Sequence, residues 1–248
     1  SCCQHQGYLG FHFQQIQKME RRQKHALLTL LIAALVLLSL SSEAKDLPKG
    51  FVYLRDYVPD AVLELRYLSN DNFVGEPIDG YLDNVSVLTE EAALALQKVQ
   101  ADLKVFGLGL KVFDTYRPQS AVDHFVRWAN DLDDIRMKAR YYPEVQKENL
   151  FSEGYIAGRS GHSRGSTVDV TIIDLITKEE LDMGSGFDFF SPLSWPTNPD
   201  MTTQQRANRM LLQILMVRHG FLPYDKEWWH FTLKDEPFPD QYFDFPVQ

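Results

Sequence analysis

Two short segments in the C-terminal half of the chain carry side chains that could bind a metal ion. The first reads SGHSRG and contains His162, and Asp169 follows it; the second reads EWWH and runs from Glu227 to His230. Two imidazoles and one carboxylate can act as ligands, and one carboxylate is left over. A catalytic zinc ion needs three protein ligands and an open position for water, and a nearby carboxylate can move protons. The pattern therefore predicts a zinc site with its own base.

The surroundings of Asp169 allow two interpretations. It lies within residues 167–173, a run rich in β-branched residues that predicts a buried strand. A carboxylate in so apolar a strand is costly unless a partner neutralises it. A zinc ion is one such partner, and a buried salt bridge, for example with Arg164, or an inward-turned hydrogen-bonded acid is another. Spacing alone favours neither.

The pair Glu227 and His230 is a weak signal when taken alone, because a surface pair beside core tryptophans would explain it equally well. In an ideal strand, residues three positions apart face opposite sides. Either the backbone bends at Glu227, or Glu227 enters from the loop that follows Pro223. The sequence does not decide between these possibilities.

Arg117 is a further candidate. It follows residues 110–113, which predict a strand, and it precedes Pro118. Its permanently charged guanidinium could stabilise an oxyanion, or it could form a structural pair with Asp114. His124 and His219 lie on predicted helices, where we expect structural or surface roles.

Composition bounds the class of protein. The 248 residues are 44% hydrophobic and carry a formal net charge of −9. This length suits one domain with a substantial core. The acidic balance argues against nucleic acid or an anionic membrane surface as a partner.

The N-terminal region has the layout of a secretory signal peptide. Residues 19–25 are basic, residues 26–40 are apolar and uncharged, and small residues precede a possible cut after Ala44. The apolar run falls short of the roughly 20 residues that span a bilayer as a helix, and an uncleaved anchor is the alternative. We therefore expect an upstream segment at 1–18, a signal peptide at 19–44, and an exported, periplasmic domain at 45–248 without stable membrane association. A cytoplasmic location is expected only if this signal does not work.

The predicted mature chain contains no cysteine, because Cys2 and Cys3 both precede it. Any metal ion in it must be held by histidine, aspartate and glutamate.

The mature chain predicts an α+β fold. Helices are expected after Thr89, after Pro118 and over residues 203–219, and strands over residues 110–113, 167–173 and 228–233. The apolar face of the first helix is expected to contain Ala92, Leu96, Val99, Leu103 and Phe106, and that of the third Ala207, Met210, Leu211, Ile214 and Leu215. Because these elements show no regular βαβ alternation, we expect one compact domain, with a small, mainly antiparallel central sheet flanked by helices and a zinc site in a cleft on the sheet.

Several stretches together resemble the D-alanyl-D-alanine dipeptidases of the vancomycin-resistance type, which are zinc peptidases related to D,D-carboxypeptidases. They occur in the family's order and cover nearly the whole predicted mature chain. In this sequence they read YLSNDNFVG from Tyr67, PIDGY from Pro77, YRP from Tyr116, SGHSRG with Asp169, MGSGFD from Met183, EWWH from Glu227 and YFDFPV from Tyr242.

The resemblance implies hydrolysis of D-Ala-D-Ala to two D-alanines and one zinc ion per chain. It implies a role for each matching residue: His162, Asp169 and His230 as zinc ligands, Glu227 as general base and acid, Arg117 as stabiliser of the transition state, Asp188 as acceptor of the substrate's ammonium, and Ser160 and Tyr67 as pocket residues.

Two alternatives remain: a D,D-carboxypeptidase acting on peptidoglycan stem peptides, and a non-catalytic, zinc-stabilised cell-wall binding module. Asp188 argues against the first, because stem peptides offer no free ammonium beside the scissile bond, and Glu227 argues against the second. The sequence predicts no oligomeric state.

Overall fold

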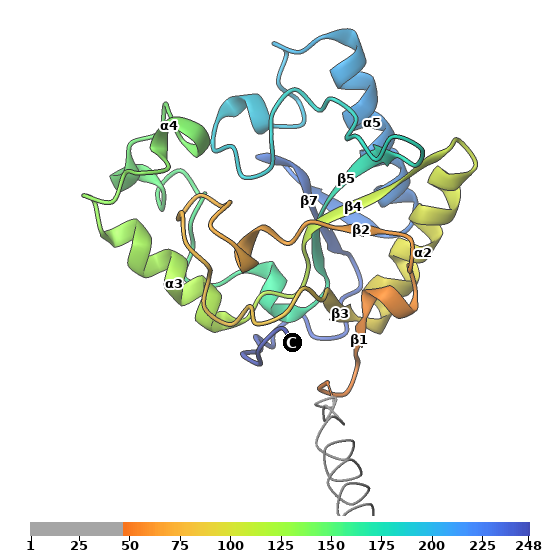
Figure 1. Cartoon of the computed structure of the whole chain (residues 1–248), viewed down its shortest axis with the longest axis horizontal. Helices are drawn as coiled ribbons and strands as arrows, with labels where there is room; N and C mark the ends of the chain where they lie inside the picture. Colours follow the sequence, from red (N-terminus) through yellow and green to blue (C-terminus); the bar gives the residue numbers. More distant parts are fainter. Residues whose placement is uncertain (1–46) are drawn as a thin grey trace, which may run out of the picture. The chain divides into compact units, whose positions relative to one another are not determined.

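The computed structural model describes residues 47–248 (Figure 1). The predicted upstream segment and signal peptide lie outside the described residues. Within residues 47–248, no helix is long and apolar enough to cross a membrane.

A five-stranded sheet forms the centre of the fold, as predicted. Its order is β2 (Val62–Leu63), β4 (Leu108–Asp114), β5 (Thr167–Asp174), β7 (Glu227–Leu233) and β6 (Phe221–Tyr224). Only β2 and β4 run parallel, and every other neighbouring pair is antiparallel. A separate antiparallel pair joins β1 (Phe51–Tyr53) to β3 (Val87–Thr89).

The helices flank the sheet. In Figure 1, α2 (Glu90–Lys104) and α5 (Thr203–Arg218) lie to the right and α3 (Gln119–Asn130) and the short α4 (Lys138–Tyr141) to the left. Single 3₁₀ turns complete the fold: η1 (Leu54–Asp56), η2 (Arg66–Leu68), η3 (Lys147–Asn149), η4 (Gly161–Arg164) and η5 (Pro192–Ser194). The α+β expectation is confirmed.

The inward face of α5 differs from the prediction. Ala207, Met210 and Ile214 are exposed, and the buried face contains Asn208 and Arg209 together with apolar residues. The reason is that Arg209 donates hydrogen bonds to the carbonyls of Met183, Leu193 and Trp195. These bonds satisfy a buried guanidinium. The helix can therefore bury a partly polar face, which the pattern of hydrophobic residues does not reveal.

The end of α2 also differs. The helix stops at Lys104, and Phe106 is 73% exposed in the turn that follows. Gly107 adopts a φ of +73° there. This left-handed conformation, which glycine adopts readily, ends the helix and leads the chain into β4 before Phe106 can reach the core.

The central sheet aligns three polar residues across three strands. Asp169 of β5 lies directly opposite His230 of β7. On its other side Asp169 lies opposite Asp114, because the register of β4 shifts between Val112 and Asp114. A bulge of this kind re-aims side chains. It brings Asp114 beside Asp169 where a regular strand would place Phe113.

The turn η4 is closed by Gly165. This residue has a φ of +86°, its N–H donates to the carbonyl of His162, and its own carbonyl accepts from Thr89. An added Cβ would lie only 2.3 Å from the ring of Phe51. Backbone conformation and close packing therefore both require glycine at the turn that carries His162.

Replacing Gly165 with alanine should destabilise the domain by about 1–3 kcal/mol, because it strains the backbone and collides with Phe51. Gly107→Ala is the matched control, since its φ is also positive but no atom lies within 4 Å of an added Cβ. Chemical unfolding measures both variants. Equal losses would show that the Phe51 contact contributes nothing.

Candidate metal centre and active site

Side-chain atoms of three residues converge at the centre of the sheet. The Nε2 atom of His162 lies 3.3 Å from Nδ1 of His230 and 3.3 Å from Oδ2 of Asp169. The Nδ1 atom of His230 lies 3.0 Å from Oδ1 of Asp169. Asp169 and His230 face each other across β5 and β7, and His162 reaches them from η4. The three residues expected to bind metal therefore form one cluster.

This donor set fits a zinc ion. Metal–ligand bonds of about 2.0–2.2 Å in a tetrahedral site place neighbouring ligand atoms about 3.3–3.5 Å apart, close to the spacings observed. Oδ1 of Asp169 is buried and accepts no hydrogen bond of good geometry, so it needs another partner. Nδ1 of His162 lies 2.6 Å from the carbonyl of Thr115, which can only accept. The proton is thereby fixed on Nδ1, and the lone pair of Nε2 is left for a metal.

The histidines also control the charge of Asp169. Burial opposes ionisation, but His162 and then His230 hold the pKa of this carboxyl well below its usual range. Asp169 is therefore an anion inside the core, which is the form that binds a cation.

Glu227 lies beside the cluster. Its position shows how it can face His230 although the two residues are three positions apart in the sequence. It is the first residue of β7, next to a register irregularity between Pro223 and Tyr224 of β6. The irregular backbone places Oε2 of Glu227 3.5 Å from Nδ1 of His230. Burial raises the pKa of Glu227 to about 7, which suits a group that accepts and returns protons near neutral pH.

Arg117 forms the structural pair, and its position also leaves the predicted catalytic role open to it. Its Nε donates to Oδ2 of Asp114 at 2.8 Å, so the structural pair is present. Its Nη2 nevertheless points toward the site, 3.6 Å from Oδ2 of Asp169. The guanidinium also lies over the rings of Tyr67 and Phe125, with its carbon 5.0 and 5.2 Å from their centres, which holds it in place.

Asp188 has an unusual backbone, with a φ of +57°. Its side chain is buried, and Oδ2 accepts a hydrogen bond from the Tyr67 hydroxyl at 2.9 Å. Burial, and then the charge of Asp169, raise its pKa well above the ordinary value. A buried acid held in an uncommon conformation is a feature typical of functional sites.

A pocket of about 180 Å³ joins these groups. All the predicted site residues line it except His162, which lies behind the surface with only 1% of its area exposed. Ser160 lines the pocket and also accepts a hydrogen bond from the backbone N–H of His162. The structure thus places every predicted site residue in or directly behind one pocket.

The sequence did not reveal the polar layer behind this pocket. Asp114 was considered only as a partner of Arg117. It is 1% exposed, accepts a hydrogen bond of 2.7 Å from the Tyr81 hydroxyl, and lies 3.6 Å from Nδ1 of His162. An acid at the end of the strand predicted over residues 110–113 was the available signal. The only signal for Tyr81 was its place in PIDGY, one of the stretches that resemble the family.

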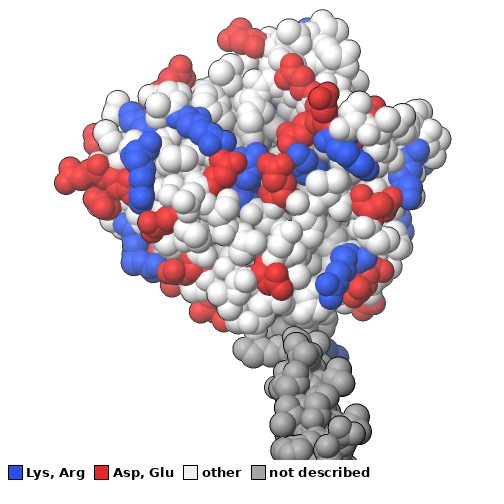
Figure 2. All heavy atoms as spheres, viewed as in Figure 1, with Lys and Arg blue, Asp and Glu red and all other residues white. Residues whose placement is uncertain are grey.

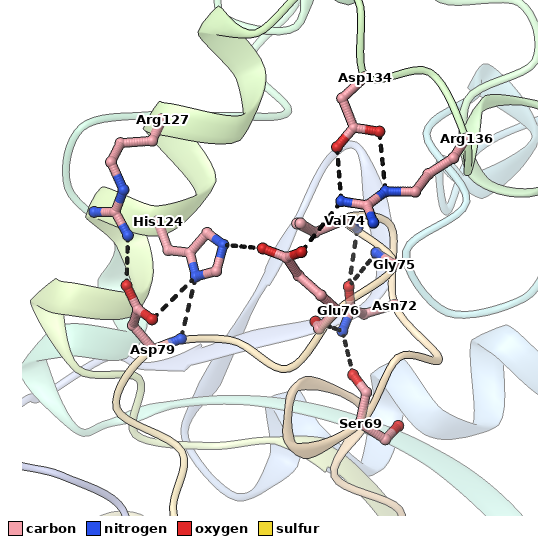
Figure 3. A network of polar contacts seen from close by, with 10 residues as sticks. All are labelled: Ser69, Asn72, Val74, Gly75, Glu76, Asp79, His124, Arg127, Asp134 and Arg136. Atoms are coloured by element: carbon pink, nitrogen blue, oxygen red, sulfur yellow. Dashed lines mark hydrogen bonds and ion pairs between the residues drawn. The ribbon is translucent and has the colours of Figure 1, made fainter.

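The other two histidines of the described chain have structural contacts. His124 of α3 binds Glu76 through Nε2 and accepts the backbone N–H of Asp79 (Figure 3). These contacts tie the segment that follows Tyr67 to α3. His219 lies 2.9 Å from Asp102.

A mainly antiparallel sheet that carries a His-Asp-His cluster beside a half-buried glutamate is the arrangement of a metallopeptidase type of site. Comparison with known families gives the same answer, since residues 48–248 match the family described as D-Ala-D-Ala dipeptidase. The chain belongs to this family and is a zinc metallopeptidase.

Curated relatives cover most of the chain. A D-alanyl-D-alanine dipeptidase of Streptomyces coelicolor is 45% identical over 79% of this chain and 98% of its own length. One of Enterococcus faecalis is 42% identical over 80% of this chain and 98% of its own. A solved vancomycin-resistance D,D-pentapeptidase, VanY, in complex with Zn(II) is more distant, with 14% identity and a TM-score of 0.37 over 62% of this chain and 76% of that one.

Asp114→Asn should lower kcat/KM by about 10- to 100-fold with metal content retained, because it removes the anion that holds Arg117. In an Arg117→Ala background the same change should cost little, since the two residues act as one unit. Steady-state kinetics and elemental analysis of the two single variants and the double variant test this. Additive losses would mean that Asp114 acts independently of Arg117.

Proposed function

We propose that this chain hydrolyses the dipeptide D-Ala-D-Ala to two D-alanines, with one zinc ion held by His162, Asp169 and His230. The observation that carries the proposal is the convergence of this ligand set, the base Glu227 and the buried acid Asp188 on one small pocket. The activity for which relatives that match over nearly their whole length are named supports it.

The chain's own residues can handle each proton and charge of a hydrolysis. Zinc, when bound, polarises a carbonyl and lowers the pKa of water. Glu227 accepts a proton from the attacking water and returns it to the leaving amine. The Nη2 group of Arg117, on the Asp169 side of the pocket, donates to the negative charge that develops on the peptide oxygen.

Asp188 supports a free dipeptide as the substrate. Its buried carboxylate, held by Tyr67, can receive the ammonium of a substrate with an unblocked N-terminus. A longer, N-blocked peptide would offer this buried acid no ammonium, so the charge of the acid would stay uncompensated, which is costly. This favours a dipeptidase over a D,D-carboxypeptidase. The base Glu227 favours either enzyme over a binding module, because a purely structural zinc site needs no base.

The test is hydrolysis of free D-Ala-D-Ala beside a peptidoglycan stem pentapeptide. The zinc-loaded protein should release D-alanine from the dipeptide and little from the pentapeptide, and a chelator should stop the reaction. Glu227→Ala should retain zinc and lose about 10²- to 10⁴-fold in kcat, because it lacks the base.

His162→Ala is the complementary variant, since it should lose zinc by elemental analysis. Preferred cleavage of the pentapeptide would overturn the dipeptide assignment. Near-normal turnover by Glu227→Ala would remove that residue from its role.

We also infer export from the signal-like residues 19–44, with D-alanine recycling from cell-wall turnover as the physiological use. The partners are then small peptides and not nucleic acids. The interspersed acidic and basic side chains on the face shown in Figure 2 support this, because they form no broad basic surface there. Cell fractionation and N-terminal sequencing check the location. A cytosolic protein with residues 19–44 intact would contradict export.

A further inference from the structure

The second charge of the substrate needs a partner. A free dipeptide is a zwitterion, and Asp188 accounts only for its ammonium. A carboxylate that enters a partly buried pocket without a cation loses hydration without compensation. In the described part of the chain, the basic side chains lining the pocket are those of Arg117, Arg159 and His230.

Two of these three are already engaged. His230 belongs to the ligand cluster. Arg117 donates to Asp114 and lies near Asp169 and Tyr67, so its charge is shared among existing partners. Neither is free to bind a carboxylate far from the reacting bond.

Arg159 is different. It is exposed, and it immediately precedes Ser160 on the segment that leads into η4. No acidic side chain of residues 47–248 forms an ion pair with it, and its guanidinium lies over the ring of Tyr242, with its carbon 5.0 Å from the ring centre. Such stacking restricts the side chain and leaves its N–H donors available for a planar, two-point contact with a carboxylate.

Tyr242 also contacts Arg164. The Nη1 of Arg164 donates to its hydroxyl at 3.4 Å, and Arg164 is held by Glu236 through an ion pair of 2.6 Å. The next residue, Phe243, donates its N–H to the carbonyl of Ser163 in η4 at 2.8 Å. The C-terminal stretch YFDFPV therefore packs beside the turn that carries His162, and the ring of its Tyr242 lies against the guanidinium of Arg159.

We propose that Arg159 binds the C-terminal carboxylate of the dipeptide and that Tyr242 positions it. The inference rests on the proposed function, which it extends to the recognition of the substrate's second charge. With an acid inside the pocket at Asp188 and a cation at Arg159, the pocket distinguishes the two ends of a zwitterion. It selects a scissile bond that is followed by one residue with a free carboxylate.

The experiment combines removal of the guanidinium with removal of the substrate's charge. D-Ala-D-Ala is compared with its C-terminal amide, which lacks the negative charge, in the zinc-loaded full chain and in Arg159→Gln. For the acid, Arg159→Gln should lower kcat/KM by about 10-fold, equivalent to about 1.4 kcal/mol. For the amide it should change kcat/KM less than about 2-fold, so the preference of the parent protein for the acid collapses.

Arg55→Gln is the matched control. Arg55 is also an exposed arginine, with its guanidinium carbon 5.0 Å from the centre of the Tyr53 ring, but it does not line the pocket. This variant should keep the preference for the acid. Tyr242→Leu should lower kcat/KM for the acid more than for the amide, because Arg159 loses its support, while zinc content stays unchanged.

Binding gives a readout independent of turnover. In the Glu227→Ala background, calorimetry should show that Arg159→Gln weakens binding of D-Ala-D-Ala by about 10-fold. Binding of the C-terminal amide should stay nearly unchanged. If Arg159→Gln affects acid and amide equally, or neither, the assignment of Arg159 is wrong while the dipeptidase activity stands. If the parent protein hydrolyses neither compound, the proposed function fails and the inference fails with it.

Discussion

The buried charge of Asp169 is the constraint on which the rest of the site depends. This carboxylate is 2% exposed in the middle of β5, with a neighbouring strand on each side. An anion in such a position is stable only when cationic or hydrogen-bonding groups surround it. His230 provides one from β7, His162 from η4 and Arg117 from the segment after β4. The candidate metal site satisfies the charge of Asp169 and still leaves its Oδ1 available to bind a metal ion.

A second layer keeps these groups in place. Asp114 accepts from both Arg117 and Tyr81, and the carbonyl of Thr115 accepts from His162. These partners fix the orientation of the arginine and the tautomer of the histidine, which the residues facing the pocket cannot fix for themselves. The bulge in β4 is essential to this layer, since it brings Asp114 to the position opposite Asp169.

The pocket is lined by both acidic and basic side chains, among them Asp188, Glu227 and Arg159. Its acids differ in protonation behaviour because their surroundings differ: the histidines hold the pKa of Asp169 below its usual range, whereas burial raises the pKa values of Asp188 and Glu227. This separation suits a small zwitterionic substrate, whose two charges and single peptide bond need three different environments.

The sequence by itself determined the chemistry. The types of side chain in SGHSRG, Asp169 and EWWH predicted a histidine–aspartate metal site with a base, and the resemblance to a known family implied a role for each of these residues. The mixture of helical and strand patterns predicted an α+β class. What only the tertiary structure decided was orientation. The irregular pairing of β6 with β7 turns Glu227 toward His230, and the bulge in β4 brings in Asp114. Hydrogen bonds from Arg209 rotate α5 so that Met210 and Ile214 face outward. The reason is physical: residue type and local periodicity are carried by neighbours in the chain, whereas register, bulges and the satisfaction of buried polar groups depend on partners far apart in sequence.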